Sequence, residues 1–274
     1  NSGEVADKSG IDKGVLEQMR YEFEYWYPVD LRSSGKDLVP NHLLFFLFHH
    51  VAIFDEDKWP QAIAVNGFVS LEGQKMSKSK GPLLTLNDAV ENYGADVSRV
   101  YILSNAEQTQ DADWRASGIE ATKKQIERFY NFSKGIVNSD ISKNNEELHL
   151  IDRWMLSRLQ HYIKETNNAL DTIKTRNAIQ NSFFFLSNDV KWYQRRGGNA
   201  LLYDILDVWV RLMSPFAPHI CEEIWESMGH KESDFVSLAA YPEHDPELID
   251  NAAELGEELI SNTLSDIEEI IKVT

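Results

Sequence analysis

A short segment flanked by glycines contains the residues best suited to chemistry. Residues 73–82 read GQKMSKSKGP and place three lysines, two serines and two glycines within ten positions. Lysine is a mobile point charge, glycine lets backbone amides approach a ligand closely, and serine adds hydroxyl donors. These residue types suit a polyphosphate, above all a transition state in which charge builds up on a leaving pyrophosphate. A solvated charged turn is the alternative, because short motifs also arise by chance.

Residues 75–79 match in full the KMSKS motif of the class I aminoacyl-tRNA synthetases, and the segment therefore resembles that family. In the family this loop closes over ATP, and its lysines stabilise pyrophosphate while the carboxylate of the amino acid attacks the α-phosphorus. The resemblance implies that Lys75 and Lys78 stabilise this charge, that Ser77 adds a donor and that Met76 packs beneath the nucleotide. Lys78 is the residue on which we expect catalysis to depend most.

Segments upstream of the lysines extend the resemblance. Gly35 and Asp37, with His42 five residues later, are similar to the family segment that holds the ATP ribose and borders the amino-acid pocket. Asn66 and Gly67 are similar to the position at which backbone groups meet adenine. The resemblance thus implies ATP contacts at Gly35, Asp37, Asn66 and Gly67 and an amino-acid pocket at His42. Taken singly, Asp37 could instead be a helix-entry residue and His42 a partly buried, hydrogen-bonded histidine.

Two longer stretches narrow the resemblance. Residues 25–42, YWYPVDLRSSGKDLVPNH, and residues 64–73, AVNGFVSLEG, are most similar to the leucine-specific enzymes of archaea and the eukaryotic cytosol. Residues 214–225, SPFAPHICEEIW, resemble a segment of the anticodon-binding helical bundle in the Leu/Ile/Val/Met branch. The resemblance implies leucine, ATP with Mg²⁺ and tRNA(Leu) as partners. Isoleucyl, valyl or methionyl specificity and a non-catalytic tRNA-binding module stay open as alternatives.

The elements that must position these residues change character along the chain. Apolar runs at residues 62–65 and 68–71 have the length of strands, and helices are predicted at residues 40–54, 85–93 and 96–104. Residues 1–13 are predicted to be irregular, and the aromatic near-alternation of residues 21–28 predicts a short strand and turn.

Beyond about residue 119 the apolar residues follow helical spacing with short connections, which predicts a bundle. Its helices are expected at residues 148–173, 178–192, 201–213 and 218–228, with an acidic helix at 250–273. The predicted fold is α/β, the C-terminal half of a Rossmann-like catalytic domain, followed by an all-α helical bundle. The predicted domains are residues 1–115, residues 116–240 and an acidic linker with a terminal helix at residues 241–274.

The composition restricts partners and location. The formal net charge of -17 argues against indiscriminate nucleic-acid binding, because the overall field repels phosphate. The single cysteine, Cys221, excludes an internal disulfide and a cysteine-based zinc site, and we expect no metal held by protein ligands alone. No apolar run is long enough to cross a bilayer, so we expect no membrane partner and a cytoplasmic location.

The RNA-facing residues and the missing parts of the family pattern complete the prediction. Arg195 and Arg196, in the sequence RRGG, are the best candidates for tRNA contact, and solvated ion pairs are the alternative. The chain contains no HIGH-like motif, which the family carries in the first half of its nucleotide-binding fold. The family's inserted editing domain and C-terminal extension are missing as well. We therefore expect either an excised segment or one piece of a split enzyme, and we expect that it forms no adenylate by itself.

Overall fold

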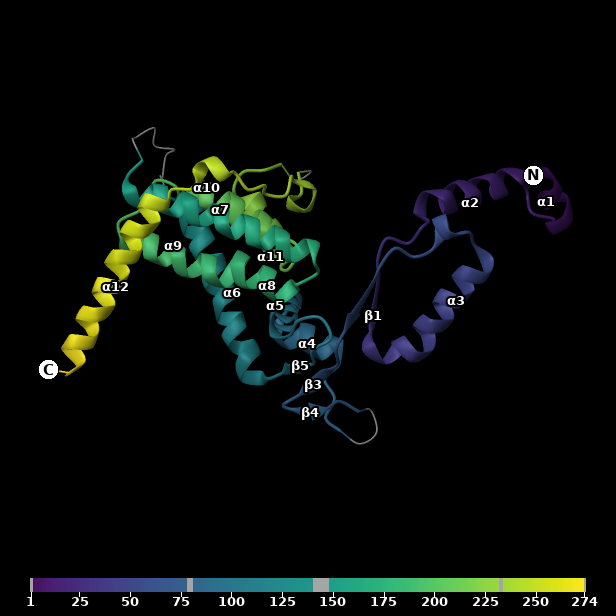
Figure 1. Cartoon of the computed structure of the whole chain (residues 1–274), viewed down its shortest axis with the longest axis horizontal. Helices are drawn as coiled ribbons and strands as arrows, with labels where there is room; N and C mark the ends of the chain where they lie inside the picture. The colour runs from purple at the N-terminus through teal and green to yellow at the C-terminus, as the bar shows by residue number, and fades with distance from the viewer. Residues whose placement is uncertain (1, 78–80, 140–147, 232–233, 274) are drawn as a thin grey trace. The chain divides into compact units, whose positions relative to one another are not determined.

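The computed structural model describes residues 2–77, 81–139, 148–231 and 234–273, which form two compact units (Figure 1). The first unit comprises the chain up to Phe68 together with Gln108–Asp111. The second comprises Val69–Glu107 and the chain from Ala112 onward. The predicted domain boundary near residue 115 rests on sequence character rather than on contacts and stays a prediction.

The first unit contains a two-stranded parallel sheet with a helical crossover. Its strands are paired in the register Gly35 opposite Asn66, and a crossover through a helix is the usual way to join parallel strands. The strand predicted at residues 62–65 and the helix predicted at residues 40–54 are confirmed. The elements are α1 (Ser2–Ser9), α2 (Lys13–Trp26), β1 (Arg32–Gly35), a π-helical turn (Val39–Leu43), α3 (Leu44–Ile53) and β2 (Ile63–Asn66).

Two predictions for the start of the chain are wrong, because helices at Ser2–Ser9 and Lys13–Trp26 stand where an irregular segment and a short strand with a turn were expected. The Asp12 carboxylate accepts the N–H groups of Gly14 and Val15 at 2.8 and 3.2 Å and so caps α2. An ion pair between Arg20 and Glu24 adds an (i, i+4) contact along the helix. These local contacts favour a helix despite the β propensity of the aromatic residues.

The second unit begins with a three-stranded sheet in the order β4-β3-β5. It is formed by β3 (Val69–Leu71), β4 (Gln74–Lys75) and β5 (Ala112–Trp114). The turn Glu72–Gly73 joins β3 to antiparallel β4, whereas β3 and β5 are parallel. The connection to β5 passes through α4 (Leu86–Tyr93) and α5 (Ala95–Asn105), both of which were predicted. Strand β5, which is only three residues long, was not predicted.

The remainder of the second unit is the predicted helical bundle. Figure 1 shows α7, α10 and α11 side by side, and their inward faces bury Met155, Leu206 and Ile224 completely. The helix predicted at residues 178–192 is interrupted by a π-helical segment, Gln180–Phe185. The helices are α6 (Ala116–Val137), α7 (Leu150–Asp171), α8 (Thr175–Ile179), α9 (Leu186–Arg195), α10 (Leu202–Met213), α11 (Pro218–Ser227) and α12 (Asn251–Val273).

Helix α12 packs only its first turns against α7 (Figure 1). Ala253 and Glu257 are buried there, whereas Leu259 and Ile270 farther along are exposed. The acidic terminal helix was predicted. None of the described helices is long and apolar enough to cross a membrane. Cys221, on α11, is completely buried, and burial raises the pKa of its thiol well above the usual value.

Two side chains on α5 hold the segment that leads into α11. Asp96 is 8% exposed, and its carboxylate accepts the Ile220 N–H at 2.7 Å and pairs with the His219 ring at 2.8 Å. Arg99 donates to the carbonyls of Pro215 and Phe216 at 2.8 and 3.2 Å. Asp96 thus satisfies an N–H in the first turn of α11, which has no partner within its own helix.

We expect Asp96→Ala to lower the free energy of unfolding of the second unit by about 2 kcal/mol, because buried donors lose their acceptor. Asp96→Asn keeps one acceptor oxygen and should cost less. Urea denaturation followed by circular dichroism measures both changes. Asp171→Ala, at an exposed residue of α7, is the control. An Asp96→Ala protein as stable as this control would contradict the assigned role.

Candidate functional site

The predicted nucleotide-binding residues of the first unit lie at one edge of its sheet. Gly35 and Asn66 end the two parallel strands and stand opposite each other in the register. Asp37 follows β1 within one turn, and Gly67 follows β2 directly. In α/β folds, ligands bind at the carboxyl ends of parallel strands. The structure therefore brings together the four residues that the sequence predicted separately.

Gly67 has a structural requirement that the sequence did not reveal. Its N–H donates to the Gln108 carbonyl at 3.1 Å, and a Cβ on residue 67 would lie 2.1 Å from the Gln110 carbonyl oxygen. The Asp111 carboxylate holds this neighbouring segment by accepting the Phe68 N–H at 2.8 Å. Within the protein, this close backbone approach already requires glycine at residue 67.

Lys36 also binds this segment. Its ammonium contacts the Asp111 carboxylate at 2.5 Å and lies 4.9 Å from the centre of the Phe68 ring. The hydrogen bond from Lys36, aided by the Phe68 N–H, lowers the pKa of Asp111. Lys36 therefore has an internal carboxylate partner at the edge of the sheet that also carries Gly35 and Asp37.

His42 lies in the π-helical turn before α3. Its side chain is exposed rather than partly buried, and its ring centre lies 6.4 Å from that of Phe46. The alternative of a partly buried structural histidine is therefore wrong. The assignment of His42 to an amino-acid pocket stays a prediction.

The lysine segment belongs to the second unit. Lys75 ends β4 opposite Ser70, and its side chain is exposed, whereas Met76 and Ser77 are half-buried. The Gly81 N–H donates to the Ser77 carbonyl at 3.3 Å, so the two flanks of the segment lie close together. Lys78 lies outside the described residues. The predicted roles of the motif stay predictions.

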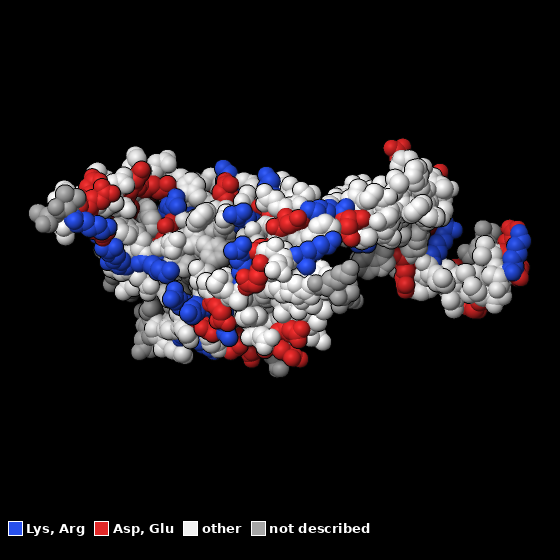
Figure 2. Space-filling model, turned by 90° about the horizontal axis from the view of Figure 1, so that it is seen from below, with Lys and Arg blue, Asp and Glu red and all other residues white. Residues whose placement is uncertain are grey.

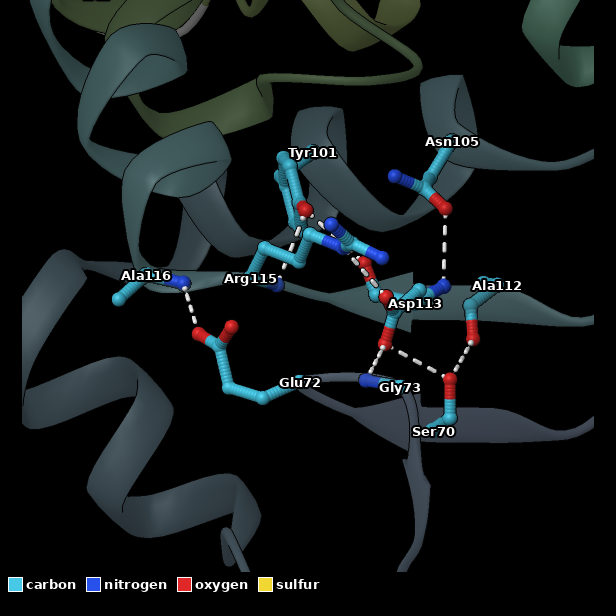
Figure 3. Close-up of polar contacts among 9 residues, drawn as sticks. All are labelled: Ser70, Glu72, Gly73, Tyr101, Asn105, Ala112, Asp113, Arg115 and Ala116. Carbon is cyan, nitrogen blue, oxygen red and sulfur yellow. Dashed lines mark hydrogen bonds and ion pairs between the residues drawn. The ribbon is translucent and has the colours of Figure 1, made fainter.

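Asp113 on β5 binds the turn from which this segment emerges (Figure 3). One carboxylate oxygen accepts the Gly73 N–H and the Ser70 hydroxyl, each at 2.8 Å. The other accepts from Arg115 Nε at 2.6 Å. These donors, led by the Gly73 N–H, lower the pKa of Asp113 to about 2, so it is ionised at neutral pH.

Glu72 binds the turn to the next helix. Its N–H donates to the Trp114 carbonyl at 2.9 Å, and its carboxylate accepts the Ala116 N–H at 2.7 Å (Figure 3). Ala116 is the first residue of α6. Neither Glu72 nor Asp113 was predicted. The Glu-Gly pair that follows the apolar run at residues 68–71 could have signalled a tight turn, but the sequence does not indicate which groups hold that turn.

Two side chains of helix α5 hold the backbone at β5. The Asn105 side-chain oxygen accepts the Asp113 N–H at 2.9 Å. The Tyr101 hydroxyl donates to the Asp113 carbonyl at 2.9 Å and accepts the Arg115 N–H at 3.0 Å (Figure 3). The backbone on both sides of the Asp113 carboxylate is therefore held by α5.

The predicted RNA-contacting arginines lie at the end of α9 and differ in their surroundings. Arg196 binds the buried Glu257 carboxylate through two nitrogens, at 2.9 and 3.2 Å. The Arg195 guanidinium lies 5.7 Å from the centre of the Trp192 ring. Figure 2 shows a face of the second unit on which Lys and Arg side chains form a run, although the chain as a whole is acidic.

Two family models match successive parts of the chain. Residues 14–134 match the family model described as "tRNA synthetases class I (M)". Residues 152–274 match the "Anticodon-binding domain of tRNA ligase". The two matches correspond to the α/β part and the helical bundle predicted from the sequence.

Curated relatives and a solved structure agree with these matches. The leucine–tRNA ligase of Methanococcoides burtonii is 71% identical over 98% of this chain, and that of Pyrococcus horikoshii is 52% identical over 98%. The chain spans about 28% of the length of these relatives. The LeuRS chain of a LeuRS–tRNA–LeuAMS complex from Agrobacterium radiobacter has the same fold, with a TM-score of 0.69 at 23% identity. That match covers 81% of this chain and 29% of the LeuRS chain. The chain therefore belongs to the class I tRNA synthetase family, in which it corresponds to a segment of the archaeal leucine–tRNA ligases.

Proposed function

We propose that this chain supplies a leucine–tRNA ligase with part of its ATP site, its lysine loop and its helical bundle. The ligase joins leucine to ATP to form an adenylate and then transfers leucine to the 3′ end of tRNA(Leu). The observation that carries the proposal is the meeting of Gly35, Asp37, Asn66 and Gly67 at the carboxyl ends of β1 and β2. Leucine is preferred over isoleucine, valine or methionine because the relatives named above are leucine–tRNA ligases.

The residues at this edge fit the nucleoside part of ATP. A carboxylate such as that of Asp37 can accept hydrogen bonds from both ribose hydroxyls. The backbone at Asn66 and Gly67 lies at the end of β2, where an adenine ring would meet it, although the Gly67 N–H already donates to the Gln108 carbonyl. Bound ATP supplies an electrophilic phosphorus and a pyrophosphate leaving group. Lys75 and Lys78 would stabilise the charge on that leaving group, with Ser77 as an additional donor and Met76 beneath the nucleotide.

Mg²⁺ fits this proposal as part of the nucleotide complex. No group of three or more His, Cys, Asp or Glu side chains in the described ranges is arranged to hold a metal ion. Mg²⁺ commonly keeps several waters and binds through substrate phosphates together with one or two carboxylates. We therefore propose that it arrives bound to ATP, in the cytoplasm where translation takes place.

The sheet of the first unit supports a role within a larger enzyme. Parallel sheets are normally covered on both faces and contain more than two strands. On α3, Phe45 and Phe48 are 62% and 63% exposed, and Ile53 is exposed as well. Several large apolar side chains exposed on one short helix fit coverage by further protein. We propose that the remaining nucleotide-binding half of the ligase covers it and supplies the rest of the ATP site.

A chimera tests the proposed function. This chain would replace the matching segment of the Methanococcoides burtonii ligase, which aligns with 98% of it. We expect leucine-dependent ATP–pyrophosphate exchange within about tenfold of the parent ligase, a difference of about 1.4 kcal/mol. The isolated chain should give no exchange. A folded chimera without exchange, or exchange by the isolated chain, would contradict the proposal.

Substitutions within the chimera assign the roles of the site residues. Asp37→Ala should raise KM for ATP, because the carboxylate would contact the ribose in the ground state and the transition state alike. Lys75→Ala should instead lower kcat by about a hundredfold, because a preorganised charge acts mainly on the developing pyrophosphate. Lys164→Ala, at an exposed residue of α7, is the control. If Asp37→Ala and Lys75→Ala behaved like this control, the assigned roles would be wrong.

We also propose that Arg195 contacts the tRNA backbone and that Arg196 does so to a lesser degree. Arg196 already binds the buried Glu257, whereas the Arg195 guanidinium stacks near an aromatic ring at the surface. Phosphate contacts made by arginine contribute affinity without reading sequence. The run of Lys and Arg side chains in Figure 2 supports an RNA-facing surface on the second unit.

We expect Arg195→Glu to weaken binding of tRNA(Leu) to the chimera by roughly threefold to tenfold and to reduce its salt dependence by about one unit of slope. Filter binding at several salt concentrations measures both quantities. Lys164→Glu makes the same charge change on another helix and is the control. Equal effects of the two substitutions would indicate a general charge effect rather than a contact at Arg195.

A further inference from the structure

We propose that Asp113 and Glu72 are positioning residues, which set the orientation of the lysine loop and connect it to the start of α6 (Figure 3). The inference rests on the proposed function, since positioning matters for catalysis only if Lys75 serves the adenylation step. Neither residue belongs to the KMSKS motif. Both act on the turn that folds β4, which contains the first residue of the motif, back along β3.

The backbone conformation of the turn Glu72–Gly73 requires a stabilising contact from outside the hairpin. Glu72 and Gly73 have φ angles of +50° and +74°, so both residues occupy the left-handed region. This conformation suits a tight two-residue hairpin, in which asparagine or aspartate followed by glycine is preferred. Glycine adopts it readily at residue 73, whereas glutamate at residue 72 does so at a cost. A tertiary contact must therefore favour this conformation of Glu72.

Glu72 makes that contact with α6. The residue before this helix, Arg115, provides no side-chain cap, and the Glu72 carboxylate accepts the Ala116 N–H instead. An acidic group at a helix N-terminus is favoured by the helix dipole as well as by the hydrogen bond. The same contact therefore satisfies the helix and holds the turn.

Asp113 secures the other residue of the turn. Its carboxylate joins Gly73 in the turn, Ser70 in β3 and Arg115 beyond β5. Strand β4 contains only two residues, and among the residues that the structure describes it pairs with β3 alone. Its direction consequently depends on the turn more than on its own ladder. Loss of the carboxylate would release the Gly73 N–H and let the hairpin change direction.

Helix α6 extends this arrangement into the bundle. It is 22 residues long, and near its far end Tyr130 binds Glu223 and Lys134 binds Ser227, both on α11. The turn Glu72–Gly73, which precedes Lys75, is thus connected to α11 through the single helix α6. A shift of α6 in the ligase would move the base of the lysine loop with it.

Hydrogen–deuterium exchange of this chain tests the structural half of the inference without any reference to catalysis. Asp113→Asn and Glu72→Gln should each speed exchange of the amides of residues 72–77 by about tenfold or more, because each replaces a charged carboxylate with a neutral amide, which has one acceptor oxygen and accepts hydrogen bonds more weakly. Asp171→Asn, an equal change of charge on α7, should leave them unchanged. Glu72→Gln alters an exposed side chain, so it remains a test even if Asp113→Asn fails to fold.

Adenylation by the chimera tests the functional half. We expect each substitution to lower kcat for ATP–pyrophosphate exchange by about tenfold while KM for leucine stays constant, since Lys75 would be displaced from the developing charge. Asp171→Asn should not change kcat. Unchanged amide exchange in both variants, or unchanged kcat in an active chimera, would overturn the inference. An inactive unsubstituted chimera would instead count against the proposed function.

Discussion

The parallel pairing of β3 with β5 is the constraint on which the lysine segment depends. It brings Ser70 to Asp113, 43 positions apart in the sequence, and so places a carboxylate beside a turn that two left-handed residues must form. Without β5 the hairpin would be a two-stranded ribbon, which is marginal in water. With it, the carboxylate of one strand and the helix that follows the same strand both hold the turn. The short sheet therefore does more to orient the motif than its size suggests.

The first unit follows a different principle. Its predicted ligand residues are brought together by strand register, because Gly35 and Asn66 end neighbouring parallel strands. Around them the backbone is closely packed, and the segment held by Asp111 leaves no room for a side chain at residue 67. A glycine can thus meet a packing requirement and adjoin a proposed ligand at the same time. Its presence alone does not distinguish the two.

The sequence predicted the elements whose signals are local. Helix α4 begins with the Thr85 and Asp88 side chains capping each other's backbone, a pattern visible in the sequence, and α10 has a strongly one-sided distribution of apolar residues. It failed where the deciding contact is distant or competes with propensity. Strand β5 is recognisable only beside β3. In α2, capping by Asp12 outweighs an aromatic alternation that resembles a strand.

The residues of the candidate site likewise divide into those that local sequence reveals and those that only distant contacts reveal. Motif residues such as Asp37 and Lys75 could be named because they resemble a family pattern. The residues that hold the motif, Asp113 and Glu72, could not be named, because a carboxylate in a short polar segment has no distinctive spacing. Their partners are backbone N–H groups, which every sequence offers. Only the folded chain identifies which N–H groups need an acceptor.

The burial of Cys221 has a practical consequence for spectroscopy. It is the single thiol of the chain, and it lies inside α11 with no exposed surface and a raised pKa. Thiolate is the form that reacts with maleimides and iodoacetamides, so this side chain should stay unmodified while the bundle is folded. A fluorophore or spin label attached through a cysteine newly introduced on the surface would therefore report from that one position, because Cys221 would carry no label.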